Sequence, residues 1–181
     1  QYIDMSKQLK ILSVGRIAPV KNYETLVEAA GILKKEGVNF SVTVVGEAVL
    51  DRDKSYERNL KQKIADLNLQ PYFNFIGKIN NQDLVGVYQS HEVFVHLSQT
   101  GSVDKSLLEA MACGLPVLSA NESSGSFLPE ELIFHKDDAG DLAVKIKRVS
   151  KLGLRDELRQ YVVKNHNLDN LIEKISAIIK S

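Results

Sequence analysis

Two basic side chains stand close together just after the first apolar segment of the chain. Arg16 and its neighbour Gly15 follow the segment 10–14, and Lys21 comes five residues after Arg16. A guanidinium can hold two phosphate oxygens at once, and an ammonium adds a compact positive charge. The pair therefore indicates a site for a phosphate-bearing ligand. Two solvated cations in an ordinary loop are the alternative interpretation.

A second anion site is expected in the stretch 97–120. An apolar segment ends there, small polar residues follow, and a helix begins after Asp104, or after Ser102 if it starts earlier. Gly114 is placed to end this helix in a left-handed conformation, with Pro116 shortly beyond it. Because free backbone N–H groups and the helix dipole meet at a helix start, such a loop attracts anions.

Glu109 is the candidate acidic residue of this helix. It stands between Leu108 and Ala110, one to two turns from the helix start. A carboxylate can accept hydrogen bonds from paired sugar hydroxyls, as acidic residues do with ribose in dinucleotide-binding folds. From this residue alone, a surface glutamate is the stronger interpretation. Asp104 and Lys105 also have two interpretations, either contacts to a polar ligand or a helix cap with a solvated neighbour.

Several catalytic and cofactor motifs are missing from the sequence. It has no G-x-G-x-x-G, no Walker-A run, no H-E-x-x-H and no G-x-S-x-G. We therefore expect no metal, no bound cofactor and no serine nucleophile. The four histidines lie in separate segments: His91, His96, His135 and His166. His96 is expected to be a hydrogen-bonded core residue, with a role near the ligand as its alternative, and Cys113 a small packing residue.

Composition narrows the class of protein. The formal net charge is zero, which argues against nucleic acid as a partner because no basic surplus exists to displace counterions. Apolar residues make up 44% and charged residues 25% of the 181 residues, as in a globular chain of one domain, 1–181. No apolar run approaches the ~20 residues of a membrane-spanning helix. The single cysteine suits a reducing compartment, so the expected location is cytoplasmic.

An alternating series of strands and helices must position these residues. Apolar and β-branched segments predict strands at 10–14, 40–45, 73–76, 93–97, 117–118 and 132–134. Apolar residues at helical spacing predict helices at 22–37, 51–69, 81–90, 104–114, 139–152, 155–166 and 168–179. Asn22 is the expected cap of the first of these helices. The predicted fold is α/β, a Rossmann-like doubly wound parallel sheet of about six strands with helices on both faces.

The residues that follow the predicted strands are rich in glycine, small hydroxyls and cations. They are Gly15-Arg16, Gly46-Glu47, Gly77-Lys78, the loop 98–105 and the loop 121–125. Ligands of such sheets bind beyond the carboxyl ends of the strands, where the strand order reverses. These segments should therefore meet around one pocket that suits a phosphate-bearing ligand.

Four ordered motifs carry a family resemblance. They are VGRIAPVKNYETLVEAAGIL, VTVVG, FNFIGKINNQDLVGVYQSHEVFVHLS and LLEAMACGLPVLSA. From about residue 10 to residue 168, the chain resembles the C-terminal, donor-binding domain of family 4 glycosyltransferases. Those are retaining enzymes of the GT-B fold, which is built from two Rossmann-like lobes. The resemblance implies transfer of a sugar from a nucleoside-diphosphate sugar to a polysaccharide or glycolipid acceptor, as in capsule or other cell-envelope synthesis.

The resemblance also implies roles for individual residues. Arg16 and Lys21 would hold the donor diphosphate and stabilise the leaving nucleotide, and Glu109 would bind the ribose hydroxyls. Further nucleotide contacts, many through the backbone, would come from Gly15, Gly46, Gly77, Lys78 and Leu107. The donor sugar would meet the loop at the start of the last motif, at Gly101, Ser102, Val103, Asp104 and Lys105. The implied partners are a nucleotide sugar and an N-terminal acceptor-binding lobe of the same protein.

Two departures from the family pattern keep other functions open. Gly101 stands where the family has a glutamate that contacts the donor sugar, and Ser102-Val103-Asp104 replaces Gly-Phe-Gly. A nucleotide-sugar-binding module without catalysis is one alternative, and a lobe of a GT-B-type sugar epimerase or phosphorylase is another. An isolated lobe of this kind should itself be inactive. A membrane-bound lipid acceptor, which would bring the protein to the inner face of the membrane, also stays open.

Overall fold

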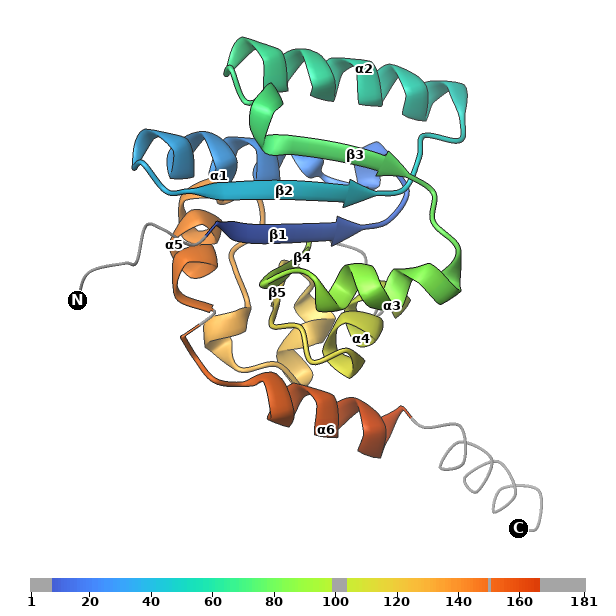
Figure 1. Cartoon of the computed structure of the whole chain (residues 1–181), viewed down its shortest axis with the longest axis vertical. Coiled ribbons are helices and arrows are strands. Elements are labelled where there is room, and N and C mark those ends of the chain that lie inside the picture. Colours follow the sequence, from blue (N-terminus) through green and yellow to red (C-terminus); the bar gives the residue numbers. More distant parts are fainter. Residues whose placement is uncertain (1–7, 99–103, 150, 167–181) are drawn as a thin grey trace.

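The computed structural model describes residues 8–98, 104–149 and 151–166, and within them the chain forms a five-stranded parallel sheet covered by helices (Figure 1). The strands are β1 (Leu9–Val14), β2 (Phe40–Val45), β3 (Phe73–Gly77), β4 (Val93–His96) and β5 (Val117–Ser119). The α-helices are α1 (Tyr23–Lys35), α2 (Asp51–Asp66), α3 (Asn81–Gln89), α4 (Lys105–Ala112), α5 (Ala139–Val149) and α6 (Arg155–Asn165). The α/β fold expected from the sequence is confirmed.

The strand order is β3-β2-β1-β4-β5, and every pairing is parallel. From β1 the chain builds outward through β2 to β3, and then returns to place β4 on the other side of β1. The direction of winding therefore reverses between β1 and β4. The helices that connect the strands cover both faces of the sheet, where α1 packs against α5 and α2, and α4 packs against α6.

The sheet is buried on both faces, which explains why its strands read as nearly continuous apolar runs. All four residues of β4 are buried, and Ile11 and Leu12 of β1 have no exposed surface. Strands and helices contribute together to one hydrophobic core. None of the described helices is both long enough and apolar enough to pass through a lipid bilayer.

Glycines fix two close backbone arrangements near the ends of elements. Gly114 has a φ of +71° directly after α4, and its N–H and that of Leu115 donate to Met111 O and Ala110 O at 2.9 and 3.0 Å. This is the Schellman arrangement, so the predicted helix end is confirmed. Gly46, which follows β2, has a φ of +135°, and a Cβ there would lie 2.0 Å from Gly15 O. Only glycine allows the ends of β1 and β2 to approach so closely.

The predicted sixth strand at 132–134 is wrong. Ile133 forms only an isolated parallel bridge with Ser119, and a short 3-10 helix (Glu130–Leu132) precedes it. A left-handed Asp137, with a φ of +59°, turns the chain soon afterwards. Pairing with β5 stops after this one bridge, and the described sheet therefore has five strands.

Other elements differ from prediction mainly at their ends. The second helix ends at Asp66 instead of residue 69, because Asn68 adopts a left-handed φ of +54°. Asn22 does precede α1, but its amide makes no cap and donates instead to Thr25 Oγ1 and Asp137 Oδ1 at 2.8 and 2.7 Å. The predicted helix 168–179 lies outside the described residues.

Candidate functional site

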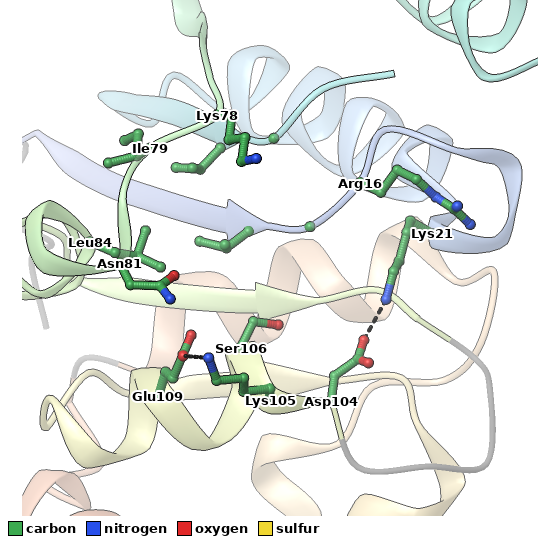
Figure 2. A pocket seen from close by; sticks show the side chains of 14 residues that line it. Arg16, Lys21, Lys78, Ile79, Asn81, Leu84, Asp104, Lys105, Ser106 and Glu109 are labelled. Atoms are coloured by element: carbon green, nitrogen blue, oxygen red, sulfur yellow. Dashed lines mark hydrogen bonds and ion pairs between the residues drawn. The ribbon is translucent and has the colours of Figure 1, made fainter. Parts of the chain in front are cut away.

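A pocket of about 350 Å³ lies beyond the carboxyl ends of β1 and β2, facing the starts of α3 and α4 (Figure 2). It is lined by Val14, Gly15, Arg16, Lys21, Val45, Gly46, Lys78, Ile79, Asn81, Leu84, Asp104, Lys105, Ser106 and Glu109. The volume falls within the range of about 300–1,000 Å³ found for small-molecule sites. Its position beside the reversal of strand order is where ligands of doubly wound sheets bind.

Most of the residues singled out from the sequence meet in this pocket. Eight of them line it, namely Gly15, Arg16, Lys21, Gly46, Lys78, Asp104, Lys105 and Glu109. Lys21 and Asp104 are 83 positions apart in the chain, so the fold alone brings them together. Their roles toward a ligand stay predictions.

Five other predicted residues are not among the lining residues. Gly77 uses its carbonyl to accept the Gly46 N–H at 2.8 Å, and it does not line the pocket. Leu107 is fully buried, and its N–H donates to Asp104 O at 3.1 Å. The proposed donor-sugar contacts Gly101, Ser102 and Val103 lie outside the described residues.

Arg16 stands at one end of the pocket with a buried acidic neighbour. Its Nε lies 3.7 Å from Asp53 Oδ2, and 44% of its side chain is exposed. Asp53 has no exposed surface, and its Oδ1, 3.6 Å from Arg52 Nε, has no hydrogen-bond partner within the described chain. Sequence reasoning missed Asp53. The Asp53 carboxylate attracts the Nε end of the Arg16 guanidinium, and part of the Arg16 side chain stays accessible to a ligand.

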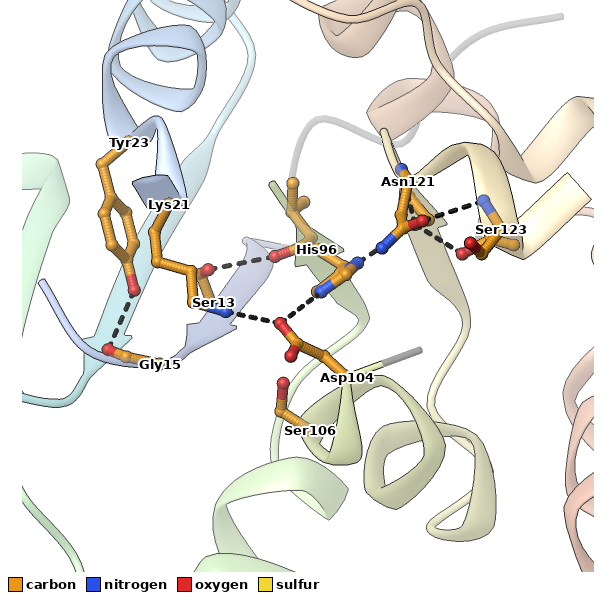
Figure 3. Close-up of polar contacts among 12 residues, drawn as sticks. Ser13, Gly15, Lys21, Tyr23, His96, Asp104, Ser106, Asn121 and Ser123 are labelled. Carbon is orange, nitrogen blue, oxygen red and sulfur yellow. Dashed lines mark hydrogen bonds and ion pairs between the residues drawn. The ribbon is translucent and has the colours of Figure 1, made fainter. Parts of the chain in front are cut away.

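Lys21 is held by Asp104 across the pocket (Figure 3). Lys21 Nζ donates to Asp104 Oδ2 at 2.5 Å, and His96 Nε2 lies 2.8 Å from the same oxygen. Burial pushes the pKa of Asp104 upward, but the hydrogen bonds from Lys21 and His96 outweigh that effect and keep the pKa below its usual value. Asp104 is therefore a carboxylate at neutral pH.

His96 links this carboxylate to the interior. It is 3% exposed, and burial lowers its pKa, although the Asp104 carboxylate opposes that shift. The imidazole is therefore neutral at pH 7, and its Nε2 carries the proton because the carboxylate can only accept. Its Nδ1 then accepts from Ser119 Oγ at 3.1 Å, and Ser119 contacts Ser124 at 3.0 Å. The expectation of a hydrogen-bonded core histidine is confirmed, and the ring also reaches a pocket residue.

Glu109 stands at the other end of the pocket, and two residues orient its carboxylate. Lys105 Nζ lies 3.1 Å from Oε1, and the Tyr88 hydroxyl donates to Oε2 at 3.1 Å. Burial first, and the Glu109 charge second, raise the pKa of Tyr88, so the hydroxyl keeps its proton and remains a donor. Tyr88 was missed in the sequence because it lies on α3. Glu109, 31% exposed, keeps accessible surface on the pocket side.

The pocket thus has three chemical regions. Basic side chains from Arg16, Lys21 and Lys78 suit an anionic group, and Glu109 suits hydroxyl donors. The third region consists of four apolar lining residues, Val14, Val45, Ile79 and Leu84, here called the apolar strip. Figure 2 shows Arg16 and Glu109 on opposite sides of the hollow. Among the described residues, no group of three acidic, histidine or cysteine side chains is placed to hold a metal ion.

The fold and the position of the pocket define a doubly wound α/β domain with its site at the topological switch point. Residues 4–166 match the family model described as "Glycosyl transferases group 1". The chain therefore belongs to this glycosyltransferase family, whose solved members share the Rossmann-like lobe architecture of the GT-B fold.

Individual relatives agree with this assignment. The chain is 31% identical over 161 residues to the amylovoran biosynthesis glycosyltransferase AmsK of Erwinia amylovora, covering 81% of this chain and 37% of AmsK. Among solved structures, HepE of Anabaena in complex with UDP superposes with a TM-score of 0.85 at 16% identity, over 97% of this chain and 50% of HepE. The C-terminal domain of the group 1 glycosyl transferase LpcC of Francisella tularensis superposes with a TM-score of 0.78 at 20% identity. This match covers 88% of this chain and 87% of the LpcC domain. The match covers between 19% and 45% of the length of these and other curated relatives.

Proposed function

We propose that this chain is the donor-binding, C-terminal lobe of a retaining, family 4 glycosyltransferase of the GT-B fold. The whole enzyme would move a sugar from a nucleoside-diphosphate sugar to a polysaccharide or glycolipid acceptor. The observation that carries the proposal is the meeting of Arg16, Lys21 and Glu109 around one pocket at the β1/β4 reversal. Family membership gives the class of reaction, and the pocket gives the chemistry of the donor.

In this proposal the basic end of the pocket binds the donor diphosphate. Arg16 presents a planar guanidinium that matches two phosphate oxygens, and Lys21 and Lys78 add point charges. As the bond between the sugar and the diphosphate breaks, negative charge grows on the leaving phosphate. Fixed cations at that place stabilise the transition state more than the bound donor, which lowers the barrier. The proposal assigns this step to these cations and includes no metal ion or organic cofactor.

The acidic end and the apolar strip serve the nucleoside. The Glu109 carboxylate is held by Tyr88 and Lys105 with its oxygens in place before the ligand arrives. Two ribose hydroxyls can then donate to it without a reorganisation cost. The base would lie against the strip near Ile79 and Lys78, and the donor-sugar contacts are proposed for Gly101, Ser102, Val103, Asp104 and Lys105.

The acceptor side of the reaction belongs to a second lobe. The match to a structure of an isolated C-terminal domain and the limited share of the relatives' length both support this proposal. In a two-lobed enzyme the reacting bond lies in the cleft between lobes, so this lobe alone would bind the donor without transferring sugar. The whole protein is proposed to act in the cytoplasm, at the membrane's inner face if its acceptor is a lipid.

A binding module without catalysis is the second candidate function. It is favoured by Gly101, which stands where the family has its donor-sugar glutamate. Turnover of UDP-sugars by the whole protein separates the two functions. Sugar transfer that keeps the anomeric configuration, as measured by NMR of the product, supports the enzyme. Donor binding with neither transfer nor hydrolysis supports the module.

Calorimetric titration tests the diphosphate site directly. Arg16→Ala should weaken UDP binding by about 1.5–3 kcal/mol, because it removes a hydrogen-bonded charge. Arg58→Ala, an exposed arginine of α2 outside the pocket, is the matched control and should leave binding unchanged. Equal affinities of wild type and Arg16→Ala would refute the role of Arg16. A screen of UDP, GDP, ADP and CMP by thermal shift would identify the base.

A further inference from the structure

Both acidic side chains in the pocket lining are paired with lysines of the same lining. Glu109 pairs with Lys105 one turn away on α4, which is a common arrangement on a helix surface. Asp104 pairs with Lys21 from a distant part of the chain, at 2.5 Å. The lysine expected to meet the donor phosphate thus already has an anionic partner inside the pocket.

Asp104 does not do what its position in the helix would ordinarily require. It is the residue before the first turn of α4, where an aspartate usually accepts a hydrogen bond from a backbone N–H of that turn. Its side chain makes no such bond. The carboxylate is instead aimed across the pocket at Lys21 and His96, so tertiary contacts have replaced the local cap.

The geometry allows one anionic oxygen of a ligand to replace Asp104 Oδ2 as the acceptor for both Lys21 and His96. A single oxygen, Oδ2, accepts from both Lys21 and His96, and 27% of the Asp104 side chain is exposed. Rotation of that side chain releases both donors together. A phosphate oxygen in the same place would offer them an equivalent anionic acceptor, so His96, 3% exposed, would not lose its partner in the exchange.

We propose that Asp104 competes with the ligand phosphate for Lys21 and thereby sets the affinity of the pocket for phosphate-bearing ligands. This inference rests on the proposed function, since it assumes a diphosphate at the basic end. Two anions cannot share the ammonium closely without repelling each other. The ligand therefore binds only after Asp104 has turned away, and the apparent affinity is reduced by the fraction of molecules in which it has done so.

The test is a double-mutant cycle measured by calorimetry with UDP, inorganic pyrophosphate and uridine. Asp104→Asn keeps the size of the side chain and an acceptor for His96 but removes the charge. It should bind UDP and pyrophosphate roughly tenfold more tightly than wild type, since relief of one charged contact of about 1.4 kcal/mol is a factor of ten. Uridine, which has no phosphate, should bind both proteins equally. In the Lys21→Ala background the gain should disappear, because the competed cation is gone.

A matched control excludes a general charge effect. Asp83→Asn removes one negative charge from an exposed position in the first turn of α3, outside the pocket lining, and should leave all three affinities nearly unchanged. Unfolding curves of each variant show that it is folded. A gain of the same size in Asp83→Asn, or one that persists without Lys21, would overturn the proposal.

The remaining outcomes separate this inference from the proposed function. UDP and pyrophosphate affinities that are equal or weaker in Asp104→Asn overturn the inference alone, and weaker affinities would make Asp104 a ligand contact. Tighter pyrophosphate binding, with no nucleotide bound by either protein, supports the competition but overturns the nucleotide-sugar function. No binding of either probe to wild type or Asp104→Asn overturns both.

Discussion

At the scale of single residues, the polar side chains of the pocket are held by partners from other elements. Tyr88 on α3 donates to Glu109 on α4, and Asp53 on α2 lies beside Arg16. Such partners fix a side chain before the ligand arrives, so less conformational entropy is lost on binding. These supporting residues belong to the site as much as the lining does.

The ribose contact proposed for Glu109 predicts a selective loss. Glu109→Gln keeps the shape but removes the charge that accepts hydroxyl protons. It should weaken UDP binding by about 1.5–3 kcal/mol, the value of a hydrogen bond to a charged group. The 2′,3′-dideoxy analogue of UDP, which has no hydroxyls to donate, should lose much less in the same calorimetric experiment. Equal losses for both nucleotides would mean that Glu109 supports the structure only.

Two histidines, the buried His96 and the half-buried His91, predict how stability changes with pH. Burial lowers the pKa of His96 and of His91 in the folded protein, whereas an unfolded histidine titrates near 6.5. Below about pH 6.5 the unfolded chain takes up protons that the folded chain does not, so the free energy of unfolding falls as the pH is lowered. The lowered pKa of Asp104 acts only at more acidic pH, below the unfolded aspartate value of about 3.9.

Urea unfolding at pH 7.5, 6.5 and 5.5 measures this effect. His96→Gln should show a smaller loss of stability across that range than wild type, and the double variant with His91→Gln a smaller loss still. Parallel pH profiles for wild type and both variants would show that neither histidine is held in its neutral form.

At the scale of elements, the ends of α4 and β2 shape the pocket. The close approach of Gly46 to Gly15 brings the carboxyl ends of β1 and β2 together beside the pocket. The Schellman end at Gly114 sets the length of α4 and turns the chain into β5. The C-terminal end of α4, the helix that carries Lys105 and Glu109, is thereby fixed relative to the sheet.

Two glycine substitutions test this arrangement. Gly114→Ala should destabilise the protein by about 1 kcal/mol, because an L-residue is strained at a φ of +71° although no atom lies within 4 Å of the new Cβ. Gly86→Ala, in the interior of α3 and equally open around its Cβ, should stabilise by about 0.5–1 kcal/mol. Chemical denaturation measures both. A neutral or stabilising Gly114→Ala would contradict the role of Gly114 as the left-handed end of α4.

Elements were easier to predict than caps and contacts. Apolar periodicity predicts buried strands and helices directly. The predicted ends of β2 agree with the observed ones, and those of α5 and α6 differ only at their C-terminal ends. The predicted cap at Asn22 is wrong because its amide donates to the distant Asp137. The predicted sixth strand is wrong because the chain turns at a left-handed Asp137 soon after Ile133. Local sequence propensity does not include such contacts with residues that are distant in the chain.

At the scale of the whole molecule, the position of the pocket could be predicted from the sequence, but only some of the contacts within it could. The rule for doubly wound sheets brought Gly15, Gly46 and Lys78 to one edge from sequence alone. Asp53 and Tyr88 were missed because they support Arg16 and Glu109 from α2 and α3. Only the folded chain shows that Asp104 points at Lys21, since no local pattern joins residues 83 positions apart.

The location of bound nucleotide on the whole molecule tests the central claim most directly. UDP titrated into isotope-labelled protein should shift the backbone NMR signals of the pocket first, at Gly15, Gly46, Lys78, Lys105 and Glu109. Signals around a second hollow, lined by residues that include Ala120, Leu128, Phe134 and Lys145, should stay in place. Shifts that gather at the second hollow, or the absence of any shift with UDP, GDP, ADP or CMP, would contradict the account.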